Sequence, residues 1–434
     1  MKKQYAIRKN IILVLIAFKI IAISCSKKDE KSSTQTDTSF GIPSLFERTG
    51  TLASAVEWQK TKEKVADLKE RIQKNPGDVK PRLQIAVIYL SEARITGEHP
   101  YYYPAVLKVL DGVLAIDPSN FEALTFKSSV KMSQHQFSEA RVIAEKARTI
   151  NPDNAYVYGV LVDANVELGN YEEAVVLSDK MQQLKPSLES YSRASYLREI
   201  YGDNKGSIEA MKLAVQAGLP GSEPQCWSKN TLGHMYEVTG QLKLAEQQYQ
   251  EILALRPSYA FALRGLAHVY SARKEYPKAL DLLSKAAAIM PEFSFHEEMA
   301  DIYALQGDKE KAAKKYTEVA KMLDEDAKSG HAVDLELCKL YTKSGQLDLA
   351  SKYGLIEYEK RPKNIDVNHA LAWVYFQNKN LEKAHQHMQV ALRTGSKDPE
   401  LLKEASAIEL AMGNTSQGNK LLAAARKTNP MVVL

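Results

Sequence analysis

Two residue types recur along this chain with one period, and that period constrains the fold more than any other feature. Prolines stand at Pro76, Pro118, Pro152, Pro186, Pro220, Pro257, Pro291, Pro362, Pro399 and Pro430, mostly 34 to 37 residues apart. A small residue recurs at Ala140, Ala174, Ser207, Ala245, Ala279, Ala312, Ala350, Ala384 and Gly418, at steps of 33, 34 or 38. Two markers that share one period indicate an array of stacked repeats rather than independent domains.

The stretch around Gly240 shows what one repeat contains. Apolar residues at helical spacing lie on both sides of this glycine, which is typical of a turn between two helices. Gly233 and Ala245 lack bulk and let two helices approach each other, and Tyr249 can fill the space beside them. Pro257 cannot continue a helix, so it ends the unit. Each repeat is therefore predicted to be a helix–turn–helix unit.

This period and these residues resemble the tetratricopeptide repeat. The pattern is carried best by residues 226–257, 260–291, 331–362 and 365–399, with Leu266, Tyr270, Ala279 and Pro291 in the second of these. The resemblance implies an all-α, right-handed superhelical solenoid of about ten repeats over residues 81–430. The phrases at 191–199, 333–337 and 371–373 are also similar to a family of uncharacterised bacterial tetratricopeptide proteins, which brings no assigned activity.

The first 24 residues have the architecture of a secretory signal. A basic start is followed by an apolar run from Ile11 to Ile23, about 13 residues against the roughly 20 that a spanning helix needs. Residues 22–25 resemble a bacterial lipobox, which implies cleavage before Cys25 and lipidation of its thiol. No aspartate follows Cys25 directly, so the inner-membrane retention signal of enteric bacteria is absent. We expect a lipid-anchored envelope protein in the outer membrane, on its periplasmic or its surface face; a plain signal peptide is the alternative.

The charge of the chain depends on this leader. The formal charge is +5, and residues 1–24 hold five basic residues and no acidic one. Without them the chain is close to neutral, which disfavours nucleic acid as a partner.

Of the three cysteines, Cys226 and Cys338 belong to different repeats. Such repeats are too far apart in a solenoid for a disulfide, so both cysteines are expected to act as small hydrophobic residues.

The domain organisation follows from these patterns. We expect a signal peptide at 1–24, a flexible tether at 25–45, an N-terminal capping helix at 46–80, repeats at 81–430 and a short tail at 431–434. The period is broken at residues 94–104, 218–227 and 324–334. Insertions in solenoids usually form loops and often carry function, so these three segments are expected to be loops.

No constellation of catalytic or metal-binding residues is visible in the sequence. His296 has no second histidine four residues later, and His385 and His387 lie two residues apart, on different sides of a helix. Nucleotide-binding loops, a Gly-x-Ser-x-Gly elbow and a Cys-x-x-Cys pair are missing. The sequence therefore favours a protein that is not an enzyme and uses no cofactor or metal.

Helical register predicts which side chains face the groove of such a solenoid. In this fold the concave wall is built from the first helix of each repeat, and its groove-facing positions are Tyr156, Asp163, Glu167, Arg193, Tyr196, Trp227, Asn230, His234, Arg264, His268, Asp301, His369, Trp373 and Phe376. Aromatic, amide and charged residues along a groove suit an extended peptide, although some of these aromatics could instead cap the core. Asn230, His234, Arg264 and His268 could receive an anionic group.

These observations favour a non-enzymatic scaffold that binds a protein or peptide partner in its groove, for example in an outer-membrane assembly or secretion complex. The first alternative is a lipoprotein that captures carbohydrate or another small ligand. It would use Trp227, Trp373 and an exposed aromatic platform at Tyr101–Tyr103, unless these tyrosines fold back onto the first repeat. The second alternative, an enzyme assembled from the insertions, has no visible nucleophile or base.

Overall fold

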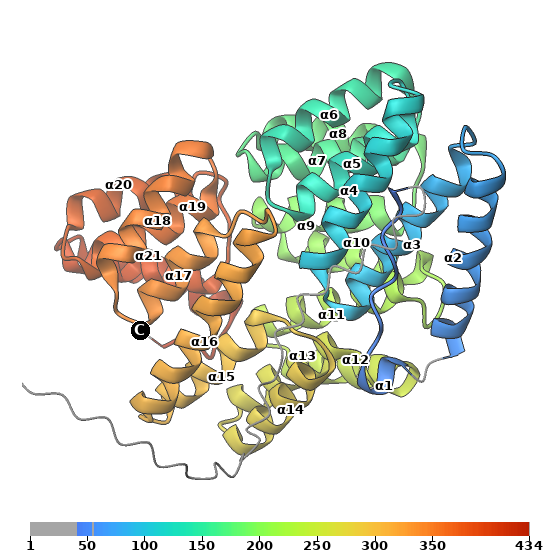
Figure 1. Cartoon of the computed structure of the whole chain (residues 1–434). Helices are drawn as coiled ribbons and strands as arrows, with labels where there is room; N and C mark the ends of the chain where they lie inside the picture. The colour runs from blue at the N-terminus through green and yellow to red at the C-terminus, as the bar shows by residue number, and fades with distance from the viewer. Residues whose placement is uncertain (1–40, 54–55, 434) are drawn as a thin grey trace, which may run out of the picture. The chain divides into compact units, whose positions relative to one another are not determined.

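The structure is a computed structural model of the chain and describes residues 41–53 and 56–433. The predicted signal peptide, Cys25 and most of the predicted tether lie outside these ranges. Within them the chain forms 22 α-helices and no strand, which confirms the all-α helical-repeat solenoid expected from the sequence (Figure 1). No helix in the described ranges has both the length and the apolar character that a membrane span requires.

The helices after the N-terminal segment form ten consecutive pairs. Two helices, α1 (Gly50–Ala53) and α2 (Val56–Lys74), precede them. The pairs are α3 (Lys80–Thr96) with α4 (His99–Ile116), α5 (Phe121–Ser133) with α6 (Phe137–Ile150), α7 (Ala155–Glu167) with α8 (Tyr171–Leu184), α9 (Leu188–Ile200) with α10 (Asn204–Ala217), α11 (Glu223–Val238) with α12 (Leu242–Leu255), α13 (Ala260–Ala272) with α14 (Tyr276–Ile289), α15 (Phe293–Leu305) with α16 (Lys309–Lys328), α17 (Asp334–Lys343) with α18 (Leu347–Lys360), α19 (Ile365–Gln377) with α20 (Leu381–Ala391), and α21 (Pro399–Ala411) with α22 (Thr415–Thr428).

The small residues of the sequence period lie where the helices of a pair touch. All nine are buried, from Ala140 in the second pair to Gly418 in the last. Tyr249 shows why glycine is also needed on the first helix: a Cβ on Gly233 would lie 2.6 Å from its ring, and one on Gly265 would lie 2.3 Å away. The periodic residues therefore report on packing rather than on a ligand.

Each turn inside a pair places one residue in the left-handed region. Glycine takes this position in seven pairs, for example Gly169 with φ +77° and Gly345 with φ +76°. His135, Lys274 and Lys379 take it in the other three, with φ between 56° and 62°. The turn geometry is thus kept where the sequence shows no glycine.

The start of the described chain is packed, which corrects the end of the predicted tether. Ile42 is only 1% exposed and lies in the first hydrophobic cluster with Tyr102 and helices α2–α4. The hydroxyl of Tyr89 donates to the Pro43 carbonyl at 2.5 Å, and that of Tyr101 donates to the Ser44 carbonyl at 2.5 Å. The Tyr101–Tyr103 segment therefore holds the first described residues of the chain in place. An exposed aromatic platform there is ruled out for Tyr102 and Tyr103, because both are buried.

The three predicted insertion loops are mostly helical. In the segment 94–104, only Gly97 and Glu98 lie between α3 and α4, and Pro104 stands inside α4. In the segment 324–334, α16 continues to Lys328, because apolar contacts such as buried Leu323 extend its packing face. In the segment 218–227, only residues 218–222 separate α10 from α11.

The turns inside the first five pairs contact the connections that follow the last five pairs, always with an offset of five pairs. We call this line of contacts the seam. In order along the chain, it joins residues 97–98, 134–136, 167–171, 201–203 and 237–240 to residues 290–291, 329–332, 361–365, 393–397 and 429–430. In a simple solenoid each repeat contacts only its neighbours in sequence. The seam adds hydrogen bonds between residues more than 190 positions apart.

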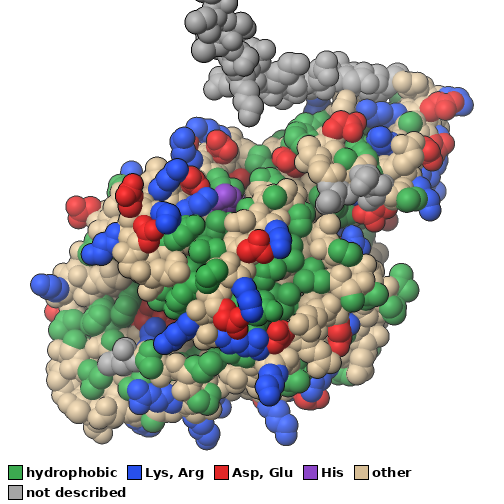
Figure 2. Space-filling model, turned by 90° about the horizontal axis from the view of Figure 1, so that it is seen from below, with side chains coloured by type: hydrophobic (Ala, Val, Ile, Leu, Met, Phe, Trp, Pro, Cys, Tyr) green, Lys and Arg blue, Asp and Glu red, His purple; other side chains and the backbone are tan. Residues whose placement is uncertain are grey.

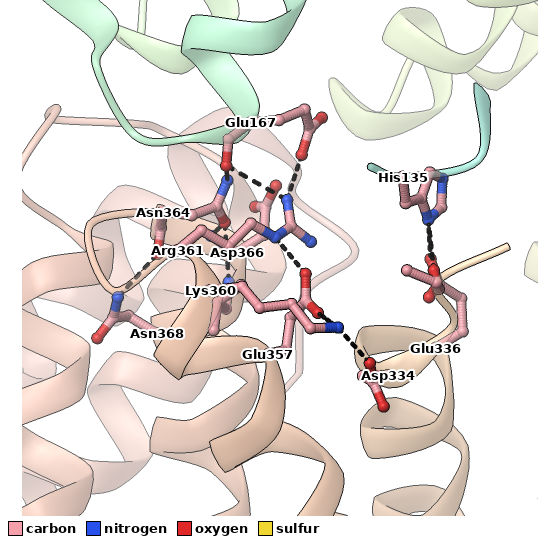
Figure 3. Close-up of polar contacts among 12 residues, drawn as sticks. His135, Glu167, Asp334, Glu336, Glu357, Lys360, Arg361, Asn364, Asp366 and Asn368 are labelled. Atoms are coloured by element: carbon pink, nitrogen blue, oxygen red, sulfur yellow. Dashed lines mark hydrogen bonds and ion pairs between the residues drawn. The ribbon is translucent and has the colours of Figure 1, made fainter. Parts of the chain in front are cut away.

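The centre of the seam is a buried polar cluster between α7 and the connection from α18 to α19 (Figure 3). The Arg361 guanidinium pairs with Glu167 across the seam and with Glu357 on its own side. The Asn364 amide donates to the Glu167 carbonyl at 2.9 Å, and the Ile365 N–H donates to the Tyr171 hydroxyl at 2.9 Å. Side chains of Arg361 and Glu357 are each 4% exposed, so this cluster is shielded from water.

A second polar contact lies one pair earlier on the seam. The Ala332 N–H donates to the Gln134 carbonyl at 2.9 Å, and the Gln136 amide donates to the Gly330 carbonyl at 2.8 Å. His135 stands 3.5 Å from Glu336 and meets the ring of His331 edge-on. The segment 324–334, which departs from the repeat period, thus supplies one side of the seam.

Candidate partner-binding surfaces

Neighbouring first helices of the pairs touch one another over two stretches of the chain, and their free sides form a surface along each stretch. Such contacts join α3, α5, α7, α9, α11 and α13 in one series and α17, α19 and α21 in another. We call the free sides of the first helices, α3 to α21, the first-helix surface. Three cavities lie on it and contain six of the ten residues on which the sequence prediction rests most: Tyr156, Asp163, Arg193, Asn230, Arg264 and Trp373.

The first cavity, which we call the inner cavity, has a volume of about 210 Å³ and lies on α3, α5, α7 and α9. The Arg193 guanidinium binds Asp163 at 2.9 and 2.6 Å and also donates to the Gly159 carbonyl at 3.0 Å. Tyr156 is 45% exposed, and its hydroxyl lies 3.2 Å from that of Ser129. The structure therefore brings Tyr156, Asp163 and Arg193 together, but the charges of the last two neutralise each other.

The second cavity, which we call the seam cavity, has a volume of about 400 Å³. Its walls come from the first pair, from α11 and from α13 and α14. It contains the predicted residues Trp227, Asn230 and Arg264, together with Arg94 and Tyr103, which the register argument did not select. Arg94 and Tyr103 also line the inner cavity, so the two spaces are neighbours.

The cationic residues predicted to receive an anion are paired with carboxylates of the same surface. Arg264 binds Glu298, and His268 lies 2.8 Å from Glu298 and 3.1 Å from Glu237. Burial disfavours the charged form of His268, but the charge of Glu298 and the hydrogen bond that His268 donates to Glu237 outweigh it and raise the pKa of His268 to about 10. Burial also disfavours the Glu237 carboxylate, yet hydrogen bonds from His234 and His268 hold its pKa at about 2.

This pairing corrects the predicted anion site. The four residues Asn230, His234, Arg264 and His268 do not form one cationic cluster, because Glu237 and Glu298 lie among them. The groove-facing positions predicted from helical register did not include either glutamate. Of the four, only Asn230 and Arg264 line the seam cavity.

The third cavity, which we call the groove, has a volume of about 530 Å³ and lies on α15, α17, α19 and α21. Its apolar centre is Trp373, whose ring stacks on Phe376 with centroids 4.8 Å apart. Lys343 binds Glu297 at 3.0 Å and Asp301 at 2.8 Å, and His369 binds Glu404 at 2.7 Å. These pairs fix the polar walls on both sides of an aromatic platform.

The other four of the ten main predicted residues line none of these three cavities. They are Glu167, Tyr196, His234 and His268. Glu167 belongs to the seam instead, where burial raises its pKa to about 7 against the opposing charge of Arg361. Tyr196 is exposed on α9. The role of these residues in binding a partner stays a prediction.

The described residues contain no group of three or more His, Cys, Asp and Glu side chains placed to hold a metal ion. Cys226 and Cys338 are both buried and unpaired, and burial raises the pKa of the Cys338 thiol to about 12. A thiol held in its neutral form is a poor nucleophile, so these cysteines act as core residues.

Comparison with known proteins identifies the repeat. A tetratricopeptide-repeat family model matches residues 131–191. The human mitochondrial import receptor subunit TOM70 is 26% identical over 57% of this chain and 41% of its own length, and the anaphase-promoting complex subunit CDC16 of Saccharomyces cerevisiae is 24% identical over 41% and 26%. A TPR repeat-containing protein of Methanocaldococcus jannaschii is 22% identical over 59% of this chain and 47% of its own length. This chain thus spans less than half the length of the curated relatives it matches.

Solved structures of low sequence identity also align. A human IFIT1 dimer aligns with a TM-score of 0.49 and 16% identity over 74% of this chain and 73% of that chain. Tetratricopeptide-repeat proteins generally act as protein-interaction scaffolds. The family match over residues 131–191, the TPR-named relative and the paired helices together support a tetratricopeptide-repeat protein.

Proposed function

We propose that this protein is a non-enzymatic adaptor that binds an extended segment of a partner protein in the groove around Trp373. The observation that carries the proposal is the groove itself: Trp373, whose ring stacks on Phe376, lines it together with polar side chains that are already paired. Preordered walls lower the entropic cost of binding, and a central tryptophan is a frequent binding hot spot. Thr342 and Gln377 add hydrogen-bonding groups for a peptide backbone.

The character of the surface and the relatives support a protein partner. Figure 2 shows one face of the molecule, on which basic and acidic side chains are interspersed among hydrophobic ones. Such a mixed surface suits polypeptide better than the uniformly charged backbone of a nucleic acid. The relatives named as an import receptor subunit and a complex subunit are both components of protein assemblies.

The groove assignment predicts the effect of one substitution. A photo-reactive cross-linking residue at Gln377, inside the groove, is expected to capture a partner in cells of the native organism. Trp373→Ala should reduce this product about 30-fold or more, because truncating a hot-spot tryptophan typically costs about 2 kcal/mol or more of binding free energy. The measurement is the yield of the cross-linked band, identified by mass spectrometry.

Trp227→Ala is the matched control, because it removes the same side chain from the seam cavity instead of the groove. The control should leave the Gln377 product unchanged. Equal yields from the Trp373→Ala variant and the unaltered protein would refute the groove assignment.

We further propose that a lipid on Cys25 anchors the adaptor to the bacterial envelope, in the outer membrane, as the lipobox resemblance implies. Cys25→Ala is expected to move the protein from the membrane fraction to the soluble fraction, since removing the thiol removes the acylation site. Ser26→Ala, at the next position, serves as the control and should stay with the membranes. Immunoblotting of the two fractions gives the result, and a Cys25→Ala protein that still sediments with membranes contradicts the anchor.

A further inference from the structure

The seam cavity is separate from the groove and is built from repeats that are not neighbours in sequence. Arg94 and Tyr103 come from the first pair, whereas Trp227 and Asn230 come from α11, in the fifth pair, and Arg264 from α13, in the sixth. The seam brings these pairs together, and at its first contact a Cβ on Gly97 would lie 2.7 Å from Met290. A volume of about 400 Å³ lies within the range of about 300–1,000 Å³ that is usual for small-ligand sites.

The cavity has a surplus of positive charge. Three guanidinium groups line it, from Arg94, Arg256 and Arg264, against the single carboxylate of Glu223. Arg264 is paired with Glu298, and Arg256 lies 3.8 Å from Glu57. Within the described part of the chain, Arg94 makes no hydrogen bond and no ion pair, although it is exposed. A guanidinium without a hydrogen bond or ion pair, in a ligand-sized cavity, can donate hydrogen bonds to an anionic group.

Aromatic rings also line the seam cavity. Trp227 is 45% exposed, Phe261 packs edge-on against Phe295, and the ring of Tyr103 is stacked on His99 with centroids 5.1 Å apart. The exposed indole face of Trp227 beside guanidinium groups favours a flat, ring-bearing ligand.

One buried atom points to a third contact. The side-chain oxygen of Asn230 is shielded from water and accepts no hydrogen bond within the described residues, although Asn230 lines the cavity. A buried acceptor without a donor is costly, so it marks a position where a ligand can supply one. The site therefore combines a place for an anion, a place for a ring and a place for a hydrogen-bond donor.

From this combination we infer that the seam cavity binds a small aromatic anion, a ring that carries a carboxylate or a phosphate and a hydroxyl or amide donor. Arg94 binds the anionic group, Trp227 contacts the ring, and Asn230 accepts from the donor. Because the walls come from both sides of the seam, the ligand binds the closed seam better than the open one and stabilises it by linkage.

The test is calorimetric titration of the full chain with 4-hydroxyphenylacetate, which carries a ring, a carboxylate and a hydroxyl donor. Its neutral amide and acetate alone are the matched probes, and each should bind at least about tenfold more weakly. Phenyl phosphate distinguishes a site that prefers phosphate from one that prefers carboxylate. Absence of saturable binding by both aromatic anions, or equal binding by the neutral amide, overturns the inference.

Variants locate the site. Arg94→Ala should weaken binding about 10- to 100-fold, the usual worth of a hydrogen bond to a charged group, and should fold normally because Arg94 has no hydrogen bond or ion pair to lose within the described residues. Lys339→Ala, in the groove, should leave the affinity unchanged. Unchanged affinity in Arg94→Ala overturns the assignment. Partner capture through Gln377 is measured separately, so failure here and failure of the proposed adaptor function give different results.

Discussion

Arg361→Ala is expected to lower the free energy of unfolding by about 3–5 kcal/mol, the range observed when one member of a buried ion pair is removed. The Arg361 side chain is 4% exposed and lies between Glu357 and Glu167. Its guanidinium also covers the ring of Phe137, with the central carbon 4.7 Å from the ring centroid. Alanine leaves Glu357 buried and opposed only by Lys360, at 3.2 Å, among the ion pairs of the described residues. The loss of stability therefore comes more from the buried, poorly compensated charge of Glu357 than from the missing contacts of Arg361.

Urea denaturation followed by circular dichroism measures this effect. Arg273→Ala is the matched control, because Arg273 pairs with Glu246 across neighbouring pairs but at the surface. Exposed ion pairs contribute about 0–1 kcal/mol, so the control should change the midpoint little. Losses of equal size in the two variants would show that the seam cluster is no more important than a surface pair.

Gly169→Ala is expected to open the centre of the seam. Gly169 has φ +77°, and a Cβ at this position would lie 2.4 Å from the Lys363 carbonyl carbon and 2.5 Å from its oxygen. Backbone atoms cannot swing aside as a side chain can, so the two sides of the seam must separate. Hydrogen exchange should then become faster in residues 361–369, above all at the Ile365 amide, which donates to Tyr171 across the seam.

Gly345→Ala separates this clash from ordinary backbone strain. Gly345 occupies the same turn position in the eighth pair with φ +76°, but nothing lies within 4 Å of its Cβ position. Both variants should lose about 1 kcal/mol because alanine is strained at positive φ, and only Gly169→Ala should expose the seam. Exchange that stays slow at Ile365 in the Gly169→Ala protein contradicts the close approach.

The helical-repeat fold was predictable because its determinants are local. A small residue where two helices touch and a proline after nine of the ten pairs act within about 34 residues, so their spacing is readable from the sequence. Even the turns at His135, Lys274 and Lys379 keep the left-handed geometry, although no glycine marks them. Packing of the neighbouring repeats imposes it there.

The seam was not predictable by the same reasoning, and the site was predictable only in part. Helical register placed Trp373 and Tyr156 correctly on the first-helix surface, because register depends only on position within a helix. It could not show that Glu167 meets Arg361, since that pairing depends on small rotations accumulated over five pairs. Helical register did not select Arg94. Most residues that line the seam cavity with Arg94 belong to repeats more than 120 residues later in the chain, and register within one helix cannot reveal this proximity.

The five-pair offset of the seam has a consequence for how the chain folds during synthesis. In an open solenoid each repeat can fold as soon as its neighbour exists, and stability is a sum of nearest-neighbour terms. Here Glu167 cannot pair with Arg361 until 194 further residues have been synthesised, which takes about 10–40 s at typical elongation rates. The early repeats therefore emerge with one edge incomplete, and the last repeats convert a one-dimensional array into a cooperative unit. Unfolding should accordingly involve both halves together rather than fraying from one end.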